Sequence, residues 1–383
     1  TPSHTTASTE MMAPLGSRLL LVVLALLPFF SAAAEPRYTA VFSFGDSLAD
    51  TGNEFALTGG ATGNTPPYGE TFFGAPTGRA SDGRLVLDFV VEALGLPHPR
   101  PYFAGETMAD FQQGVNFAYG RSTALGPEFF ESKGFTLFMP VSLANQTEWF
   151  RNVLQLAGAV EEQRKLMATS LVMMGEMGIH DYLIFITGKL AEAEIRTFVP
   201  HIVGAIRSVI TEVIDAGAKT VVVRGMIPLG CQPLLLALIE GTGADYSRPT
   251  GCLTRLNDLT RMHNHALMRM VLDLRRAYRG TGTAILYADQ FDPVTALVST
   301  PGKYGFGDKP LAACCGGSGT YNFDPTFATL CGMPGANKCA DPSKYVSWDG
   351  IHLTDAANRH VAGNVLRSIV LRQTPYMAHL SSS

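Results

Sequence analysis

Positive charge is scarce and scattered in this sequence. Only 16% of the 383 residues are charged, the formal net charge is −4, and lysine and arginine form no cluster longer than two or three residues. Because nucleic-acid binding relies on a basic patch that neutralises phosphates, the sequence excludes this class of function. The share of hydrophobic residues, 46%, is that of an ordinary globular protein with room for a large core.

The N-terminal segment lacks an apolar run long enough to cross a membrane. Residues 19–30 are twelve consecutive apolar residues, which would span only ~18 Å of helix against a hydrocarbon core of ~30 Å. They follow Arg18 and precede small residues at 31–34, a pattern typical of a secretory signal peptide that is cleaved after Ala34. We predict that residues 1–34 comprise translated upstream sequence (1–11) and a signal peptide. The protein is then secreted, with no membrane span after cleavage.

Cysteine is absent from the first half of the chain, and the six cysteines of the second half show no C-x-x-C spacing of a metal site. In a secreted chain this pattern predicts disulfides that pin long loops. We expect at least two, with Cys231 paired to Cys252 across one strand-to-helix connection, and Cys314 and Cys315 reaching toward Cys331 and Cys339. The one acceptable sequon, at Asn145, predicts glycosylation.

No internal repeat is visible, and short β-rich runs alternate with amphipathic segments of helical length. This alternation predicts a parallel sheet with helices on both faces, in a single α/β domain from about residue 37 to 375. Two stretches rich in glycine and proline, 59–84 and 301–345, interrupt it and are expected to form long loops of a binding face. The predicted strands are 38–44, 171–174, 220–225 and 284–288, and the predicted helices are 84–94, 192–216, 253–278 and 354–371.

The chain offers a serine outside the usual G-x-S-x-G motif. In "FSFGDSLADTGN", Ser47 follows the first predicted strand and is either a nucleophile at the carboxyl end of the sheet or a turn serine. In "WDGIHLTDAANRH", Asp349 and His352 precede a helix that Thr354 could cap, and they are either an oriented general base or a plain loop pair. The stretches "GVNFAYGRSTAL" and "MGEMGIHDY" could supply oxyanion donors or be tight turns.

Together with "PPYGETFFG", "GRASDGRLVLDFVVEALGLP", "MIPLGC" and "CCGGSGTYN", these stretches make the chain similar to the plant GDSL esterase/lipase family of the SGNH hydrolase superfamily. The resemblance covers nearly all of the mature chain. It implies an SGNH-type, flavodoxin-like three-layer α/β/α fold and an ester hydrolase of the cell wall or extracellular space. By the same resemblance, Ser47 is the nucleophile, His352 the general base and Asp349 its orienting carboxylate. We expect a monomer without cofactor or metal that acts on small-molecule, lipid or polysaccharide esters.

Two positions depart from the family pattern. The family's "NFAxGGAT" block places a glycine N–H in the oxyanion hole where this chain has Arg121, and its "GxND" block places an asparagine where this chain has His180. Arg121 keeps a backbone N–H, so this donor survives if its φ is negative, whereas a positive φ would cost roughly 1 kcal/mol and shift the loop; Gly120 could also take over the position by a one-residue adjustment. The His180 ring N–H could replace the asparagine amide. The predicted oxyanion donors are therefore the Ser47 N–H, the Arg121 N–H and His180.

These departures also allow a second hypothesis, a catalytically weak or silent relative that serves as a cell-wall binding protein. The combination of Ser47, Asp349 and His352 argues against it, and the two altered positions argue for it. Three further acidic residues are expected to brace the site loops rather than react: Asp46, Glu176 and Asp181.

Overall fold

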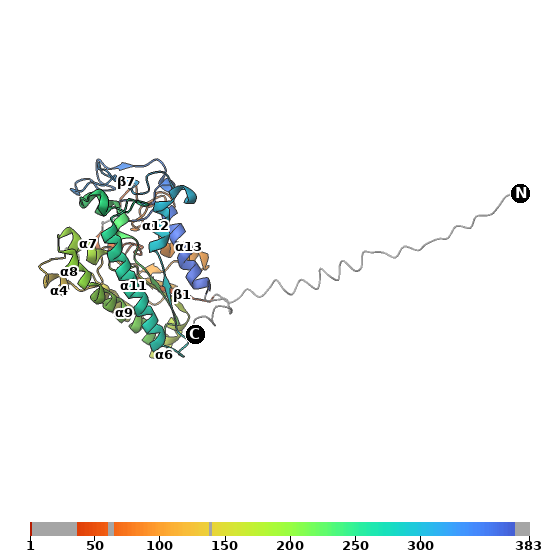
Figure 1. Cartoon of the computed structure of the whole chain (residues 1–383). Coiled ribbons are helices and arrows are strands. Elements are labelled where there is room, and N and C mark those ends of the chain that lie inside the picture. The colour runs from red at the N-terminus through yellow and green to blue at the C-terminus, as the bar shows by residue number, and fades with distance from the viewer. Residues whose placement is uncertain (2–36, 60–64, 138–139, 372–383) are drawn as a thin grey trace. The chain divides into compact units, whose positions relative to one another are not determined.

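A six-stranded parallel sheet forms the centre of the protein, in a computed structural model that describes Thr1 and residues 37–59, 65–137 and 140–371 (Figure 1). The strand order is β2-β3-β1-β4-β5-β6. The four predicted strands are confirmed, and two short strands join them: β3 pairs with β1, and β2 pairs with β3 at the edge of the sheet. The strands are β1 (Ala40–Phe44), β2 (Arg100–Pro101), β3 (Gly114–Asn116), β4 (Ser170–Met174), β5 (Thr220–Arg224) and β6 (Ala284–Ala288).

Two sets of helices flank the sheet, as predicted for a three-layer α/β/α fold. Helix α11 packs on α9 and β6, while α13 packs on α3, α12 and β6. The longer helices are α3 (Val86–Ala93), α5 (Leu143–Leu156), α6 (Val160–Ala168), α7 (Ile179–Thr187), α9 (Val199–Asp215), α11 (Thr254–Ala277), α12 (Phe291–Ser299) and α13 (Asp355–Leu371). The shorter ones are α2 (Asn53–Thr58), α4 (Pro127–Glu131), α8 (Glu192–Thr197) and α10 (Pro233–Leu238).

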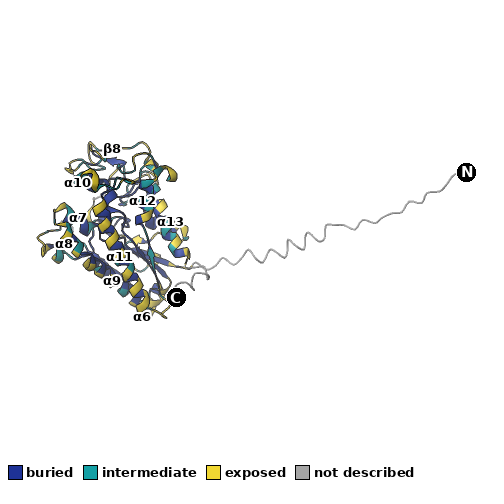
Figure 2. Cartoon of the chain, viewed as in Figure 1, coloured by how far each residue is buried: buried dark blue, intermediate teal, exposed yellow. Residues whose placement is uncertain are grey.

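The pattern of buried residues differs between strands and helices, as their sequence patterns predict. Strands β1, β4 and β5 are buried at every position, as expected for parallel strands covered on both faces. Helix α11 alternates buried and exposed residues along its length (Figure 2), because only one stripe of an amphipathic helix faces the core. Thr354 caps α13 as predicted, since its Oγ1 accepts a hydrogen bond from the Ala357 N–H at 3.2 Å.

The predicted single helix 192–216 is wrong in one respect, because it is divided into α8 and α9. The division lies at Phe198, and Pro200 stands in the first turn of α9. A proline lacks the N–H that a continuous helix needs and restricts the residue before it, so a new helix begins there. By length and composition, residues 192–215 could cross a membrane, but half of the apolar window is buried inside the protein, as in a core helix.

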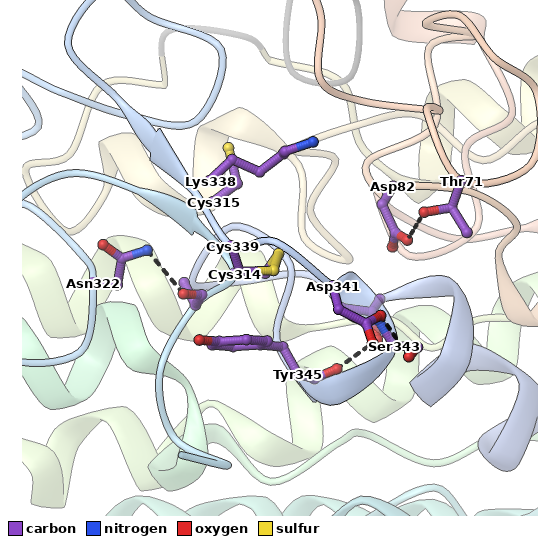
Figure 3. The surroundings of a disulfide bond; sticks show 12 residues. Thr71, Asp82, Cys314, Cys315, Asn322, Lys338, Cys339, Asp341, Ser343 and Tyr345 are labelled. Carbon is purple, nitrogen blue, oxygen red and sulfur yellow. Dashed lines mark hydrogen bonds between the residues drawn. A yellow bond between two sulfur atoms is a disulfide. The ribbon is translucent and has the colours of Figure 1, made fainter. Parts of the chain in front are cut away.

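Three disulfides secure the C-terminal half. They join Cys231 to Cys252, which is the predicted pair, Cys314 to Cys339 and Cys315 to Cys331. The last two resolve the partners that the sequence left open between Cys331 and Cys339. Figure 3 shows Cys314 and Cys339 beside the two-residue strands β7 (Cys315–Gly316) and β8 (Asn337–Lys338) of the long loop 301–345. Closing loops of this length stabilises a fold by about 3 kcal/mol each in the chain-entropy model. The predicted signal peptide and the domain end at residue 375 lie outside the described ranges.

Candidate active site

Three of the predicted site residues follow three neighbouring strands, at the carboxyl ends of the sheet. Ser47 follows β1, Arg121 follows β3 and His180 begins α7 after β4. Because β3, β1 and β4 are adjacent and parallel, their carboxyl ends point in the same direction. The sheet therefore gathers three segments that are far apart in sequence, at the edge where α/β folds carry their sites.

The turn that carries Ser47 is held by the residue before it. The Asp46 side chain accepts a hydrogen bond from the Leu48 N–H at 3.0 Å, and the Asp46 carbonyl accepts from the N–H groups of Ala49 and Asp50. Asp46 is buried, whereas Ser47 is partly exposed. Asp46 therefore braces the turn, and the serine side chain is the part that solvent and substrate can reach.

Asp349 and His352 belong to a tight loop just before α13. The Asp349 Oδ1 atom accepts hydrogen bonds from the Ile351 N–H at 3.0 Å and the His352 N–H at 2.9 Å. Gly350 has a φ of 99°, and an added Cβ would lie 2.4 Å from the Phe323 ring. Glycine is therefore required here for both its backbone conformation and its size, and the loop keeps the carboxylate and the imidazole of the pair close together.

A continuous chain of hydrogen bonds links the three predicted triad residues. Ser47 Oγ lies 2.7 Å from His352 Nε2, and His352 Nδ1 lies 2.7 Å from Asp349 Oδ2. An ionised carboxylate only accepts hydrogen bonds, so the Nδ1 atom carries the proton and Nε2 is left to accept from the serine hydroxyl. This tautomer is the one that can remove a proton from Ser47.

The charges of the site reinforce this assignment. Burial would raise the pKa of Asp349, but the nearby His352 and the hydrogen bonds from the loop lower it to about 2. Burial opposes protonation of His352, yet the charge and hydrogen bond of Asp349, with smaller contributions from Asp46 and Glu54, raise its pKa. The pair thus stabilises the imidazolium ion that forms when His352 takes a proton.

Tyr68 is a site residue that the sequence argument did not single out. Its hydroxyl donates a hydrogen bond at 2.8 Å to Asp349 Oδ2, the same oxygen that His352 contacts. The Tyr68 ring is buried and packs edge-on against Trp348. Only the "PPYGETFFG" block pointed to this segment, and it carried no information on the partner 281 residues away.

Arg121 adopts a left-handed backbone conformation. Its φ is 64°, so the positive-φ alternative holds, at a cost of roughly 1 kcal/mol. The suggestion that Gly120 might take over is wrong, because the Gly120 N–H donates to Asp50 Oδ2 at 2.8 Å. The Arg121 Nε lies 3.2 Å from the buried Glu54 carboxylate, so an ion pair stands beside the serine.

Glu54 is a second residue that the sequence argument missed. Burial raises its pKa to about 7, although the charge of Arg121 works in the opposite direction. A Cβ atom on Gly120 would lie 2.0 Å from Glu54 Oε2, so this glycine makes room for the carboxylate. The sequence signal was only an acidic residue in the first turn of the short helix α2.

His180 stands at the start of α7 and lines the same cavity as Ser47 and His352. Burial, together with the charges of Arg121 and His352, lowers the pKa of His180 to about 4. The ring is therefore neutral near pH 7 and has one N–H to donate. The next residue, Asp181, accepts hydrogen bonds from the N–H groups of Ala124 and Leu125, and so ties the His180 segment to the Arg121 segment.

A cavity of about 460 Å³ opens over Ser47. This volume lies within the range of small-molecule sites. Polar groups gather near the serine, and the rest of the wall is apolar. The apolar lining includes Leu137, Ile179, Leu183, Leu234, Leu330 and Ile351.

Among the described residues, one of the two long loops contributes to this lining. Leu330 and Phe327 come from loop 301–345, whereas the described part of loop 59–84 contacts the site through the hydrogen bond from Tyr68 to Asp349. Within the described ranges, no group of three or more His, Cys, Asp or Glu side chains is arranged to hold a metal ion.

A serine, an imidazole and a carboxylate joined in line by hydrogen bonds, with the serine and the imidazole in the lining of the cavity, form the arrangement that serine hydrolases use. Comparison with known sequences identifies the family. The family described as GDSL-like Lipase/Acylhydrolase matches residues 41–365, and the chain belongs to it.

Characterised and named plant proteins are similar along almost their whole length. The sinapine esterase of Brassica napus is 42% identical over 348 residues, which are 88% of this chain and 87% of that protein. A GDSL esterase/lipase of Arabidopsis thaliana is 40% identical over 339 residues, 86% of this chain and 84% of its own. A second one from the same plant is 41% identical over 336 residues, again 86% and 84%.

Proposed function

We propose that this chain is a secreted serine esterase that hydrolyses carboxylic esters through an acyl-enzyme on Ser47. The observation that carries the proposal is the chain of short hydrogen bonds from Ser47 through His352 to Asp349. The family supports ester hydrolysis in general, with small-molecule or lipid esters as substrates. The geometry supports the particular residues and their roles.

In the first half-reaction, Ser47 Oγ attacks the ester carbonyl carbon while its proton passes to His352 Nε2. The new carbon–oxygen bond converts the carbonyl into a tetrahedral oxyanion, and the resulting imidazolium is stabilised by Asp349. Collapse of the oxyanion breaks the bond to the alcohol oxygen, which takes the proton from His352 Nε2. The alcohol leaves, and the acyl group stays on Ser47.

In the second half-reaction, a water molecule replaces the alcohol. His352 Nε2 removes a proton from the water as the water oxygen attacks the acyl carbon. The second tetrahedral oxyanion collapses, Ser47 Oγ recovers its proton from His352, and the carboxylic acid leaves. No atom of a metal or cofactor is needed to balance either half.

The oxyanion is held by three donors, the N–H of Ser47, the N–H of Arg121 and the neutral ring of His180. The place of Arg121 in the lining of the cavity that contains Ser47 supports its part. The neutral charge state of His180 and its place in the cavity wall support the third donor. One such donor contributes about 10²–10³ to turnover.

Secretion is supported by the signal-like residues 19–34 and by the three disulfides, which form in oxidising compartments. The cell wall or extracellular space is the proposed location. Secretion would also allow glycosylation at Asn145, which is half-buried in the first turn of α5. N-terminal sequencing of the secreted protein should find Glu35 first, and glycosidase treatment should lower its mass.

The decisive test is Ser47→Ala. Because Ser47 Oγ is the only atom proposed to bond to the substrate, kcat for a p-nitrophenyl ester should fall by about 10⁴–10⁶. An organophosphonate should label one equivalent of serine in the wild type and none in the variant. Ser208→Ala, at an exposed serine of α9, is the matched control and should retain both activity and labelling.

Turnover by Ser47→Ala in a preparation free of other esterases would contradict the mechanism. A wild type with neither turnover nor labelling would favour the silent, wall-binding relative instead. The same preparation, checked for folding by circular dichroism, thus separates the two functions.

A further inference from the structure

A second cavity of about 450 Å³ lies beside the catalytic one. The two cavities share two lining residues, Thr187 at the end of α7 and Phe327 in loop 301–345. Both side chains are exposed to a large extent, and Phe327 is 44% exposed. A chain bound over Ser47 can therefore continue past Thr187 and Phe327 without crossing the protein core.

Helix α7 runs along both cavities. Ile179, Leu183 and Ile184 line the first, Thr187 lines both, and Ile186 lines the second. A helix rises about 1.5 Å per residue, so Thr187 lies about 12 Å further along α7 than Ile179. The two cavities together therefore follow about 12 Å of α7, which is roughly the length of a medium-length hydrocarbon chain.

The walls of the second cavity are mostly apolar. The apolar side chains come from the ends of α7 and α10 and the start of α11, and include Ile186, Leu190, Leu238, Ile239, Leu256 and Leu259. Four charged side chains also line the cavity, namely Lys189, Glu192, Glu240 and Arg255, and Arg255 lies 3.5 Å from Glu192, which also pairs with Arg196. Apolar walls do not satisfy the hydroxyl groups of a sugar chain, whereas they match a hydrocarbon chain.

We propose that the second cavity is the subsite for the distal part of a medium-length to long acyl chain, with the ester carbonyl at Ser47. Thr187 and Phe327 form the passage between the cavities. This inference rests on the proposed acyl-enzyme on Ser47. The acyl chain is the better occupant than the alcohol, because it stays bound to Ser47 through both half-reactions while the alcohol must leave before water enters.

The test uses charged substitutions in the second cavity that lie away from the catalytic residues. Leu190→Arg and Ile239→Arg each place a charge among the apolar walls, at half-buried positions that can tolerate a longer side chain. Leu272→Arg is the matched control, because Leu272 is 50% exposed on α11 and lines neither cavity. The substrates are p-nitrophenyl acetate, p-nitrophenyl decanoate and decyl acetate, each below its aggregation concentration.

Each buried methylene group contributes up to about fourfold in affinity, so a lost subsite should lower kcat/KM for the decanoate by about 10-fold or more. The acetate should change less than about twofold, because it does not reach the second cavity. The control variant should match the wild type on both esters. A selective loss with two different variants also excludes misfolding, which would lower both activities alike.

Three results would overturn the subsite. These are an unchanged decanoate rate, equal losses on decanoate and acetate, or a selective loss on decyl acetate alone, which would assign the cavity to the alcohol. Failure of the proposed function looks different, because the wild type would then hydrolyse none of the esters and would not react with the organophosphonate.

Discussion

Replacing Tyr68 by phenylalanine is expected to move the acid limb of the pH–activity profile to higher pH. The Tyr68 hydroxyl and His352 Nδ1 donate to the same oxygen of Asp349. Removing the hydroxyl leaves that oxygen to His352 alone, so the carboxylate stabilises the imidazolium more strongly and the pKa of His352 rises. Since His352 must be neutral to act as a base, a higher pKa shortens the active range on its acid side.

The size of the shift follows from the hydrogen bond. A hydrogen bond to a charged group contributes about 1.5–3 kcal/mol, and only the part that differs between neutral and protonated His352 moves the pKa. If a third to a half of this hydrogen-bond energy differs between the two charge states of His352, the pKa of His352 rises by about 0.5–1 unit, at 1.36 kcal/mol per unit. The plateau kcat should fall less than about tenfold, because the triad itself is intact.

The assay is kcat/KM of an activated ester from pH 4 to pH 9, which reports the pKa of the free enzyme. Tyr278→Phe is the matched control, because its hydroxyl also donates to a carboxylate, Asp215, at 2.8 Å but far along the chain from the site. An acid limb that stays in place in Tyr68→Phe, or that moves equally in Tyr278→Phe, would refute the reasoning.

Three more variants test other contacts. His180→Ala should lower kcat by about 10²–10³ with little change in KM, because the hydrogen bond acts mainly on the developing oxyanion. His180→Asn should retain or raise kcat. Equal rates in the wild type and both variants would show that His180 has no part in catalysis. Asp88→Asn should lower the free energy of unfolding by about 3 kcal/mol at pH 7, because it leaves Arg79 without its buried partner. Burial would raise the pKa of Asp88, but His98 and Arg79 lower it to about 2. Its contribution should therefore be complete above about pH 4 and disappear as the pH falls toward 2, as measured by urea unfolding.

Much of the fold could be predicted because long apolar runs carry a strong signal. The strands β1, β4, β5 and β6 were read directly from their composition, and so were helices α11 and α13, although β6 is only partly buried. Strands β2 and β3 were missed because two or three residues show no periodicity, and their place depends on the pairing of β3 with β1 and of β2 with β3. The division between α8 and α9 had a local signal in Pro200, which the apolar pattern around it outweighed.

The site divides in the same way. The hydrogen-bonding loop of Asp349 and His352 is local, three residues apart, and its sequence pattern could be recognised. Tyr68 and Glu54 could not be assigned from the sequence, because their roles depend on partners 281 and 67 residues away. A tyrosine or a glutamate in a loop carries no sign of its partner until the chain is folded.

The disulfide loop and the catalytic base are physically connected. The Cys314 N–H donates to the Ser347 carbonyl at 3.0 Å, and the Cys315 N–H donates to the Trp348 carbonyl at 2.7 Å. Asp349 follows Trp348 directly. The segment that leads to Asp349 and His352 is therefore hydrogen-bonded to the loop that two disulfides close.

Ser47, by contrast, leaves the ribosome early in synthesis and meets His352 only after 305 further residues. A newly made chain therefore carries Ser47 long before it carries His352, and the segment before His352 is hydrogen-bonded to a loop that the late cysteines close. We expect the enzyme to be inactive during its synthesis and to lose activity when these disulfides are reduced.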